Sequence, residues 1–221
     1  MNEPSIALVT GASRGLGREV ALRLLARGFT VIAGMRSPEP LMDLEILALD
    51  VADEGSIRAA AEAVRTRHGR LDVLVNNAGI LLDGHLGVLE VDGDTFRRTL
   101  ETNVLGALWT VQAFAPMMPP GARIVNVSSG GGQLSEPSTW APAYCISKTA
   151  LNAVTVQLAE ALKPRGIAVN AVCPGWVRTD MGGPEAPRSL GQGAASILWA
   201  ITEAGPEITG GFWRDGKPVA W

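Results

Sequence analysis

The chain has 221 residues, of which 47% are hydrophobic and 19% charged, and its formal net charge is −3 at pH 7. This size and composition predict one folded domain that spans residues 1–221. An acidic chain lacks the basic surface that binds phosphates of nucleic acids, and no segment is apolar for long enough to cross a membrane. The N-terminus has no signal-peptide pattern, and the two cysteines have no metal-ligand spacing. We therefore expect a cytoplasmic protein with reduced thiols, no metal site and no nucleic-acid or membrane partner.

A glycine-rich turn joins the first predicted strand to the first predicted helix. Residues 5–10 are apolar strand formers, and Gly11, Gly15 and Gly17 follow them in the pattern Gly-x3-Gly-x-Gly. Glycines at such a turn let backbone N–H groups approach a pyrophosphate, which the positive end of the helix also attracts. The pattern differs from the common dinucleotide fingerprint, so a structural turn and a nucleotide site are equally supported by this motif alone.

The second predicted strand, residues 29–34, leads to Arg36 where an NAD-binding protein usually has an acid. A guanidinium cannot accept a hydrogen bond from the ribose 2′-hydroxyl, but it can bind a 2′-phosphate through paired charged hydrogen bonds. Arg14 in the glycine turn can add a second contact. The alternative is that Arg36 is a solvated loop residue. Given a dinucleotide site, the arginine favours NADP over NAD.

The rest of the chain alternates short apolar runs with longer helical patterns. Residues 209–221 are expected to add a last strand with a turn at Asp215 and Gly216. The alternation predicts an α/β fold in a single domain, a Rossmann-type doubly wound parallel sheet of about seven strands with helices on both faces. The remaining strands are expected at residues 45–49, 71–75, 123–129 and 167–172, and the main helices at 53–68, 92–118 and 191–204.

The expected helix 92–118 is apolar nearly all the way round from Asn103 onward. One face can pack on the sheet and the other needs a partner, which indicates either a subunit interface in a homodimer or homotetramer or a helix inside a larger core. If Asn103 is buried, its side-chain amide must form hydrogen bonds with other groups. It either makes a local hydrogen bond or, near a ligand, holds a water in a proton relay.

Tyr144 is the only tyrosine of the chain, and Lys148 follows it by four residues. In a helix both side chains lie on one face, so an ammonium sits beside a phenol. A neighbouring cation favours the phenolate, which makes the pair a candidate acid/base with a lowered tyrosine pKa. The alternative is an amphipathic helix that carries the two residues by chance. This helix is expected to end before Pro164.

Seven pieces of sequence in one order resemble the short-chain dehydrogenase/reductase family, in the branch that reduces carbonyls with NADPH. Each piece is weak alone, but the ordered set is specific, and it covers residues 5 to about 180. The pieces are Thr10-Gly-x3-Gly-x-Gly17, Asp50-Val51, Asn76-Asn-Ala-Gly79, Asn103, Ser129, Tyr144-x3-Lys148, and Pro174-Gly175 with Thr179.

The resemblance implies hydride transfer between NADP(H) and a ketone or aldehyde, or the reverse reaction on an alcohol. Tyr144 would be the general acid/base, Lys148 would lower its pKa and bind the nicotinamide ribose, and Ser129 would orient the carbonyl. Asn103 would hold a water of the proton relay. Ser128 is the rival for the serine role, and Ser129 is preferred because the family's strand ends on the second hydroxyl.

The resemblance also implies a cofactor site and a substrate pocket. The gap from Ser129 to Tyr144 is longer than usual in the family, so the loop 130–141 is expected to reshape the pocket. The segment after Thr179 is short, which favours an open pocket with relaxed specificity for an apolar or aromatic ketone. Trp140 and Trp176 are its candidate walls, with core packing as the alternative. The candidate cofactor residues are Gly11, Ser13, Arg14, Gly15, Leu16, Gly17, Arg36, Asp50, Val51, Asn77, Ala78, Gly79, Tyr144, Lys148, Pro174, Gly175, Val177 and Thr179.

Two other function classes compete with a carbonyl reductase. A module that binds NADP(H) as a sensor or for assembly needs no chemistry, and the complete set of Asn103, Ser129, Tyr144 and Lys148 argues against it. A nucleotide-sugar epimerase or dehydratase also uses Tyr-x3-Lys, but this chain lacks the large C-terminal substrate domain.

Overall fold

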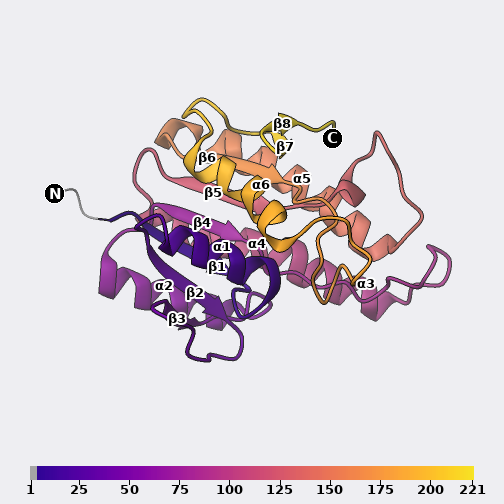
Figure 1. The fold of residues 1–221 in the computed structure, drawn as a ribbon, viewed down its shortest axis with the longest axis horizontal. Coiled ribbons are helices and arrows are strands. Elements are labelled where there is room, and N and C mark those ends of the chain that lie inside the picture. The colour runs from indigo at the N-terminus through magenta and orange to yellow at the C-terminus, as the bar shows by residue number, and fades with distance from the viewer. Residues whose placement is uncertain (1–3) are drawn as a thin grey trace.

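An eight-stranded sheet forms the centre of the computed structural model, which describes residues 4–221. The strand order is β3-β2-β1-β4-β5-β6-β7-β8, and every neighbouring pair is parallel except the last, between β7 and β8. Figure 1 shows the N-terminal strands at one side of the sheet and the C-terminal strands at the other. The strands are β1 (Ile6–Thr10), β2 (Thr30–Met35), β3 (Glu45–Ala48), β4 (Val73–Asn76), β5 (Arg123–Val127), β6 (Ala168–Val172), β7 (Phe212–Arg214) and β8 (Lys217–Pro218).

The strand order reverses between β1 and β4, so the sheet is doubly wound as the sequence predicts. The carboxyl ends of the parallel strands share one edge, and the long loops that follow β4, β5 and β6 gather at that end of the molecule (Figure 1). The expected last strand and its predicted turn form a hairpin of β7 and β8, which brings the sheet to eight strands, close to the predicted number of about seven. Its turn has positive φ at Asp215 (52°) and Gly216 (73°), and this turn conformation folds the chain back on itself.

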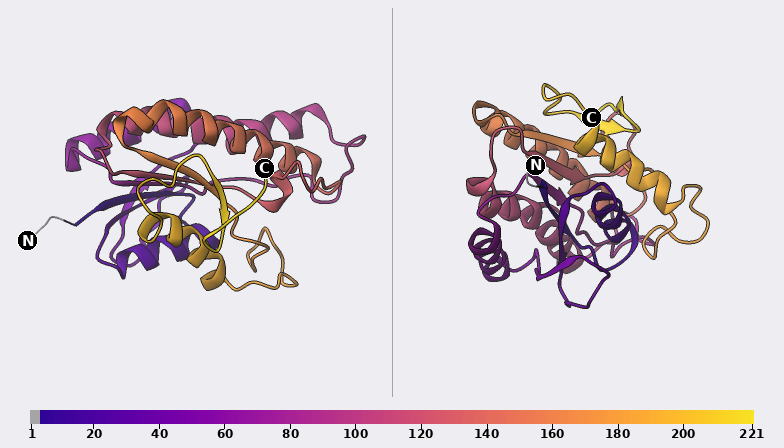
Figure 2. Two further views of the ribbon diagram at one scale, coloured as in Figure 1. Left: turned by 90° about the horizontal axis from the view of Figure 1, so that it is seen from above. Right: turned by 60° about the vertical axis from the view of Figure 1, so that its left-hand side comes forward.

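Helices cover both faces of the sheet, and Figure 2 shows the sheet between the two layers. The first face carries α1 (Gly15–Leu25) and α6 (Leu190–Thr202), which pack on one buried apolar cluster. The second face carries α2 (Glu54–His68), α4 (Gly106–Phe114) and α5 (Pro142–Leu162), which pack on another. Because both faces are covered, the central strands β1, β4 and β6 are buried along their whole length, without alternation.

The boundaries of α2 follow the signals that the sequence carries. The side chain of Asp53 caps its start by accepting a hydrogen bond from the Gly55 N–H at 2.7 Å. Gly69 ends it in the left-handed conformation, with φ 70°. No helix among residues 4–221 is long and apolar enough to span a membrane.

The expected helix 92–118 is continuous but not uniform. It begins as α3 (Gly93–Leu100), widens to a π-helical turn at Glu101–Leu105, continues as α4 and tightens to a 3₁₀ turn at Ala115–Met117. Periodicity cannot predict the π turn, because an inserted residue shifts the register of the side chains without changing their apolar character. Such turns often occur at functional sites, and this one contains Asn103.

α4 packs so closely on the loop after β3 that Gly106 has no room for a side chain. A Cβ on Gly106 would lie 2.6 Å from the carbonyl oxygen of Val51. An alanine normally stabilises a helix relative to glycine, but here we expect Gly106→Ala to lower the free energy of unfolding by about 1–3 kcal/mol through overpacking. Chemical denaturation measures this change.

The matched control is Gly93→Ala, where the added methyl group would meet only the mobile end of the Arg97 side chain, at 3.3 Å. This variant should change the free energy of unfolding by less than about 1 kcal/mol. Equal stability of the two variants would contradict the tight contact.

Candidate active site

Hydrogen bonds tie the turn after β1 to the end of β4, at the point where the strand order reverses. The Thr10 hydroxyl accepts from the backbone N–H groups of Asn77 and Ala78, both at 3.0 Å. In return the Asn77 side-chain amide donates to the carbonyl oxygens of Thr10 at 2.9 Å and Gly11 at 3.2 Å. The two segments that the sequence assigns to the cofactor site are therefore held as one unit.

The glycine turn fits a phosphate-bearing ligand. Gly11 has φ 64°, and a Cβ on it would lie 2.9 Å from the Ala78 Cα, so only glycine allows this approach. Arg14 is the N-cap residue of α1 but makes no side-chain cap, which leaves the first N–H groups of the helix to bind a ligand. Thr179, from the loop after β6, lies over the turn, 3.6 Å from where a Cβ of Gly15 would be.

The two arginines of the predicted 2′-phosphate site lie near the same edge but differ in their contacts. Arg36 is exposed directly after β2 and forms no ion pair with any residue in 4–221. Arg14 pairs with Asp180 at 2.7 Å, and both side chains are more than two-thirds exposed. A surface pair of this kind contributes little to stability, so a phosphate can displace Asp180. No pattern in the sequence indicates the pairing of Arg14 with Asp180.

Asp50 and Val51 lie beside this edge, in the loop between β3 and α2. The Asp50 carboxylate accepts a hydrogen bond from the Ala52 N–H at 3.0 Å, and its own N–H donates to the Ser56 hydroxyl at 2.9 Å. Val51 is buried and its carbonyl faces Gly106. The loop is thus fixed by its own turn and by α4.

Ser129, Tyr144 and Lys148 come together at the carboxyl end of β5. Tyr144 is 9% exposed, and its phenol hydrogen-bonds with the Ser129 hydroxyl. The Lys148 ammonium donates to the Val127 carbonyl at 2.8 Å and lies 5.5 Å from the centre of the Tyr144 ring. Ser128 is buried instead against Asn152, to which its hydroxyl donates at 2.6 Å. Of the two candidate serines, only Ser129 is thus shown in contact with the phenol.

The structure corrects the predicted effect of Lys148 on Tyr144. Burial raises the pKa of Tyr144 to about 12, because desolvation disfavours the phenolate more than the Ser129 hydrogen bond favours it. Burial also lowers the pKa of Lys148 to about 8. The predicted lowering of the tyrosine pKa takes account of the neighbouring charge alone, whereas in the structure both groups are buried. At neutral pH Tyr144 is therefore a neutral phenol that can donate its proton.

Asn103 is buried in the π turn and joins three segments. Its side-chain oxygen accepts from the Ile80 N–H at 2.8 Å, and its amide donates to the Ile80 carbonyl and the Ser147 hydroxyl, both at 2.9 Å. The local hydrogen bonds expected for a buried amide are present. A Cβ on Gly79 would lie 3.2 Å from the Asn103 side-chain oxygen and 3.6 Å from the Lys148 ammonium. Both groups therefore lie close to the backbone of Gly79.

Trp140 and Trp176 are not core residues. Trp140 is 49% exposed and its ring meets that of Tyr144 edge to face, 6.0 Å between centroids. Trp176 is 56% exposed, and its indole N–H donates to the Gly182 carbonyl at 2.7 Å. Both rings therefore present apolar surface outside the packed interior, as pocket walls require.

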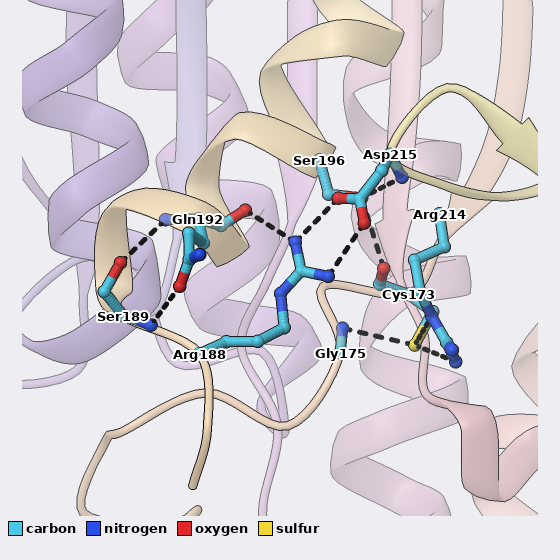
Figure 3. A network of polar contacts seen from close by, with 8 residues as sticks. All are labelled: Cys173, Gly175, Arg188, Ser189, Gln192, Ser196, Arg214 and Asp215. Carbon is cyan, nitrogen blue, oxygen red and sulfur yellow. Dashed lines mark hydrogen bonds and ion pairs between the residues drawn. The ribbon is translucent and has the colours of Figure 1, made fainter.

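A polar network that sequence reasoning missed holds the loop after β6 to the C-terminal hairpin (Figure 3). Arg188 makes two hydrogen bonds to the Asp215 carboxylate, at 2.6 and 2.8 Å, and its side chain packs on Gly175. Beside it, the Cys173 sulfur accepts from the Arg214 guanidinium at 3.1 Å and from the Gly175 N–H at 3.4 Å. The segments are distant in sequence, so no local pattern could have indicated the network.

Comparison with known proteins identifies the class to which this fold and site belong. The model of the short chain dehydrogenase family matches residues 5–189, and the chain is a member of this family. It is 36% identical over 186 residues to the NADPH-dependent pterin aldehyde reductase of Arabidopsis thaliana, a match that covers 79% of this chain and 75% of that protein.

Two solved structures are similar over their whole length. The NADPH-bound carbonyl reductase from chicken fatty liver has a TM-score of 0.91 and 30% identity, and the match covers 100% of both chains. The carbonyl reductase Sniffer of D. melanogaster has a TM-score of 0.90 and 30% identity, again covering 100% of both. The resemblance inferred from the ordered motifs is confirmed at the level of the family.

The buried ammonium of Lys148 makes stability depend on pH. Its pKa is about 8 in the folded protein and has an ordinary value of 10.5, so between these values the unfolded chain binds a proton that the folded protein has lost. The free energy of unfolding should therefore rise with pH across this window. Chemical denaturation of the protein without coenzyme, at several pH values, measures the rise.

The control is Lys148→Met, which removes the titrating group and should remove the rise. Tyr144 begins to ionise in the unfolded state of both proteins above about pH 10, so its effect cancels in the difference between them. A difference in stability that stays constant across the window would contradict the burial of a titrating ammonium.

Proposed function

We propose that this chain is an NADPH-dependent oxidoreductase that reduces a ketone or aldehyde to an alcohol, and runs reversibly as an alcohol dehydrogenase. One observation carries the proposal: a buried neutral phenol, Tyr144, hydrogen-bonds with Ser129 within reach of the Lys148 ammonium. This arrangement holds a proton where a carbonyl oxygen can receive it. The family assignment and the NADPH-bound structural relative support the same reaction.

The chain has the residues to hold NADP(H). The glycine turn and the start of α1 would hold the pyrophosphate, and Arg36 and Arg14 would hold the 2′-phosphate. As the family resemblance implies, the loop from Pro174 to Thr179 would lie over the nicotinamide end. When bound, the cofactor supplies a hydride for the carbonyl carbon in the reduction and accepts it in the reverse reaction. Asp50, Val51 and the Asn77–Gly79 segment complete the proposed site.

Side chains of the site would then transfer the proton that the developing alkoxide needs. Ser129 donates a hydrogen bond to the substrate oxygen and orients it, and Tyr144 gives its phenolic proton to the alkoxide that develops there. Lys148, as an ammonium beside the phenol, stabilises the tyrosinate left behind and binds the ribose. Asn103 lies against Gly79 next to the ammonium and supports a relay that returns a proton from solvent.

We further propose an apolar or aromatic carbonyl substrate, because the half-exposed rings of Trp140 and Trp176 flank the loops at this end of the sheet. A homodimer or homotetramer is supported by apolar side chains exposed on the helical face, namely Leu105 (40%), Ile146 (43%) and Val156 (41%). Two free cysteines, both buried, support a cytoplasmic location.

The assignment of the proton donor is tested with Tyr144→Phe. Removal of the hydroxyl should lower kcat/KM for carbonyl reduction by about 10²-fold or more, the usual contribution of a positioned general acid, while NADPH binding is retained. NADPH oxidation against a broad panel of ketones and aldehydes, with fluorescence titration of NADPH, measures both quantities. An undiminished rate, or a native protein inactive on the whole panel, would count against a reductase.

The neighbouring serines supply the matched control for this test. Ser129→Ala should lower kcat/KM, because the hydrogen bond to the substrate oxygen is lost. Ser128→Ala removes the same hydroxyl group one residue earlier, where it bonds only Asn152, and should reduce stability more than turnover. Loss of activity in Ser128→Ala alone would reverse the assignment.

The 2′-phosphate site is tested with Arg36→Asp. This variant should lower kcat/KM with NADPH by about 10- to 100-fold, the effect of losing hydrogen bonds to a charged group, and leave the value with NADH the same or higher. The control is Arg27→Asp, which makes the same charge change in an exposed residue beyond the far end of α1. An unchanged preference for NADPH in Arg36→Asp would refute the proposed phosphate contact.

A further inference from the structure

The helix that carries Tyr144 begins without a cap of its own. The N-cap residue of α5 is Ala141, held at φ 45°, and its methyl side chain can accept no hydrogen bond. Pro142 has no N–H group to donate. Tyr144 is the third residue of α5, so the proposed proton donor lies in the turn where helices fray most readily.

Asp83 supplies the missing acceptor from a distant part of the chain. Its carboxyl oxygen Oδ2 accepts a hydrogen bond from the Ala143 N–H at 2.6 Å, across 60 residues of sequence. The side chain is fully buried, and its Oδ1 has no hydrogen-bond partner within residues 4–221. Burial of a carboxyl group is costly, and at this place the positive end of a 21-residue helix offsets the cost.

The other groups of the site do not depend on the end of α5 in this way. Lys148 lies one turn further into the helix and is held by the Val127 carbonyl, and Asn103 is held by the backbone of Ile80. Asp83 is in the loop after β4, the loop that also carries Asn77 and Gly79. Its carboxyl therefore links the proposed cofactor side of the site to the first turn of α5.

We propose that Asp83 is a positioning residue, whose buried carboxyl holds the first turn of α5 and thereby places the Tyr144 phenol against Ser129. The inference rests on the proposed function, because Asp83 acts through Tyr144. Without the bond to Ala143, the first turn loses its anchor, and the phenol moves relative to the carbonyl oxygen that it must protonate. Misplacement by about 1 Å is enough to slow catalysis by about 10²-fold.

The test compares Asp83→Ala with Asp83→Asn. The alanine variant removes the acceptor and should lower kcat for carbonyl reduction by about 10- to 100-fold, with the KM for NADPH unchanged. The asparagine variant keeps an acceptor oxygen for the Ala143 N–H and should recover most of the lost kcat. Amide hydrogen exchange should show faster exchange in the first turn of α5 in the alanine variant, and unchanged exchange toward Leu162.

The control is Asp92→Ala, which removes another helix-capping aspartate of the same loop. Asp92 is exposed and accepts from the Asp94 and Thr95 N–H groups, both at 2.9 Å, at the start of α3. Its loss should lower the Tm without lowering kcat. The comparison of the two variants therefore separates the effect of lower overall stability from the effect of a displaced Tyr144 phenol.

The outcomes distinguish the positioning role from the function on which it rests. If the native protein reduces no carbonyl, the proposed function fails. If it is active and folded Asp83→Ala keeps kcat within about twofold, or Asp83→Asn recovers nothing, the positioning role is overturned. Should Asp83→Ala not fold, Asp83→Glu replaces it: the carboxyl is retained one methylene further out, so kcat should fall, and an unchanged kcat would again overturn the role.

Discussion

The arrangement of the site follows from the reversal of strand order between β1 and β4. Parallel strands bring their carboxyl ends to one edge, and the reversal opens a crevice there because the connections on its two sides lead away from each other. The hydrogen bonds between Thr10 and Asn77 close the base of this crevice. The glycine turn, the two arginines and the proposed catalytic residues all lie at this edge of the sheet.

Burial determines the electrostatics of the proposed catalytic pair. A phenol and an ammonium side by side in water would favour the phenolate, but the raised pKa of Tyr144 and the lowered pKa of Lys148 both result from desolvation. At neutral pH the phenol is therefore neutral, while Lys148, with a pKa of about 8, remains largely an ammonium. A neutral phenol is the form that reduction of a carbonyl requires, because the alkoxide must receive a proton.

Long-range polar contacts hold the loops that surround the crevice. Arg188 and Asp215 connect the loop after β6 to the terminal hairpin, so the small antiparallel extension of the sheet supports the segment over the nicotinamide end of the proposed cofactor site. Asp83 makes a corresponding connection from the loop after β4 to α5. Short contacts of this type let irregular loops keep a fixed geometry without secondary structure of their own.

The sequence by itself determined the alternation of strands and helices, the family, and the candidate positions from Gly11 to Thr179, because these depend on local periodicity and on ordered motifs. The sequence also predicted the turn at Asp215 and Gly216, and the family resemblance favoured Ser129 over Ser128, but the antiparallel strand β8 and the π turn around Asn103 could not be determined from it. It also gave the wrong direction for the pKa of Tyr144. Tertiary structure decided these features, since burial and contacts between distant segments arise only when the sheet and its helices pack together.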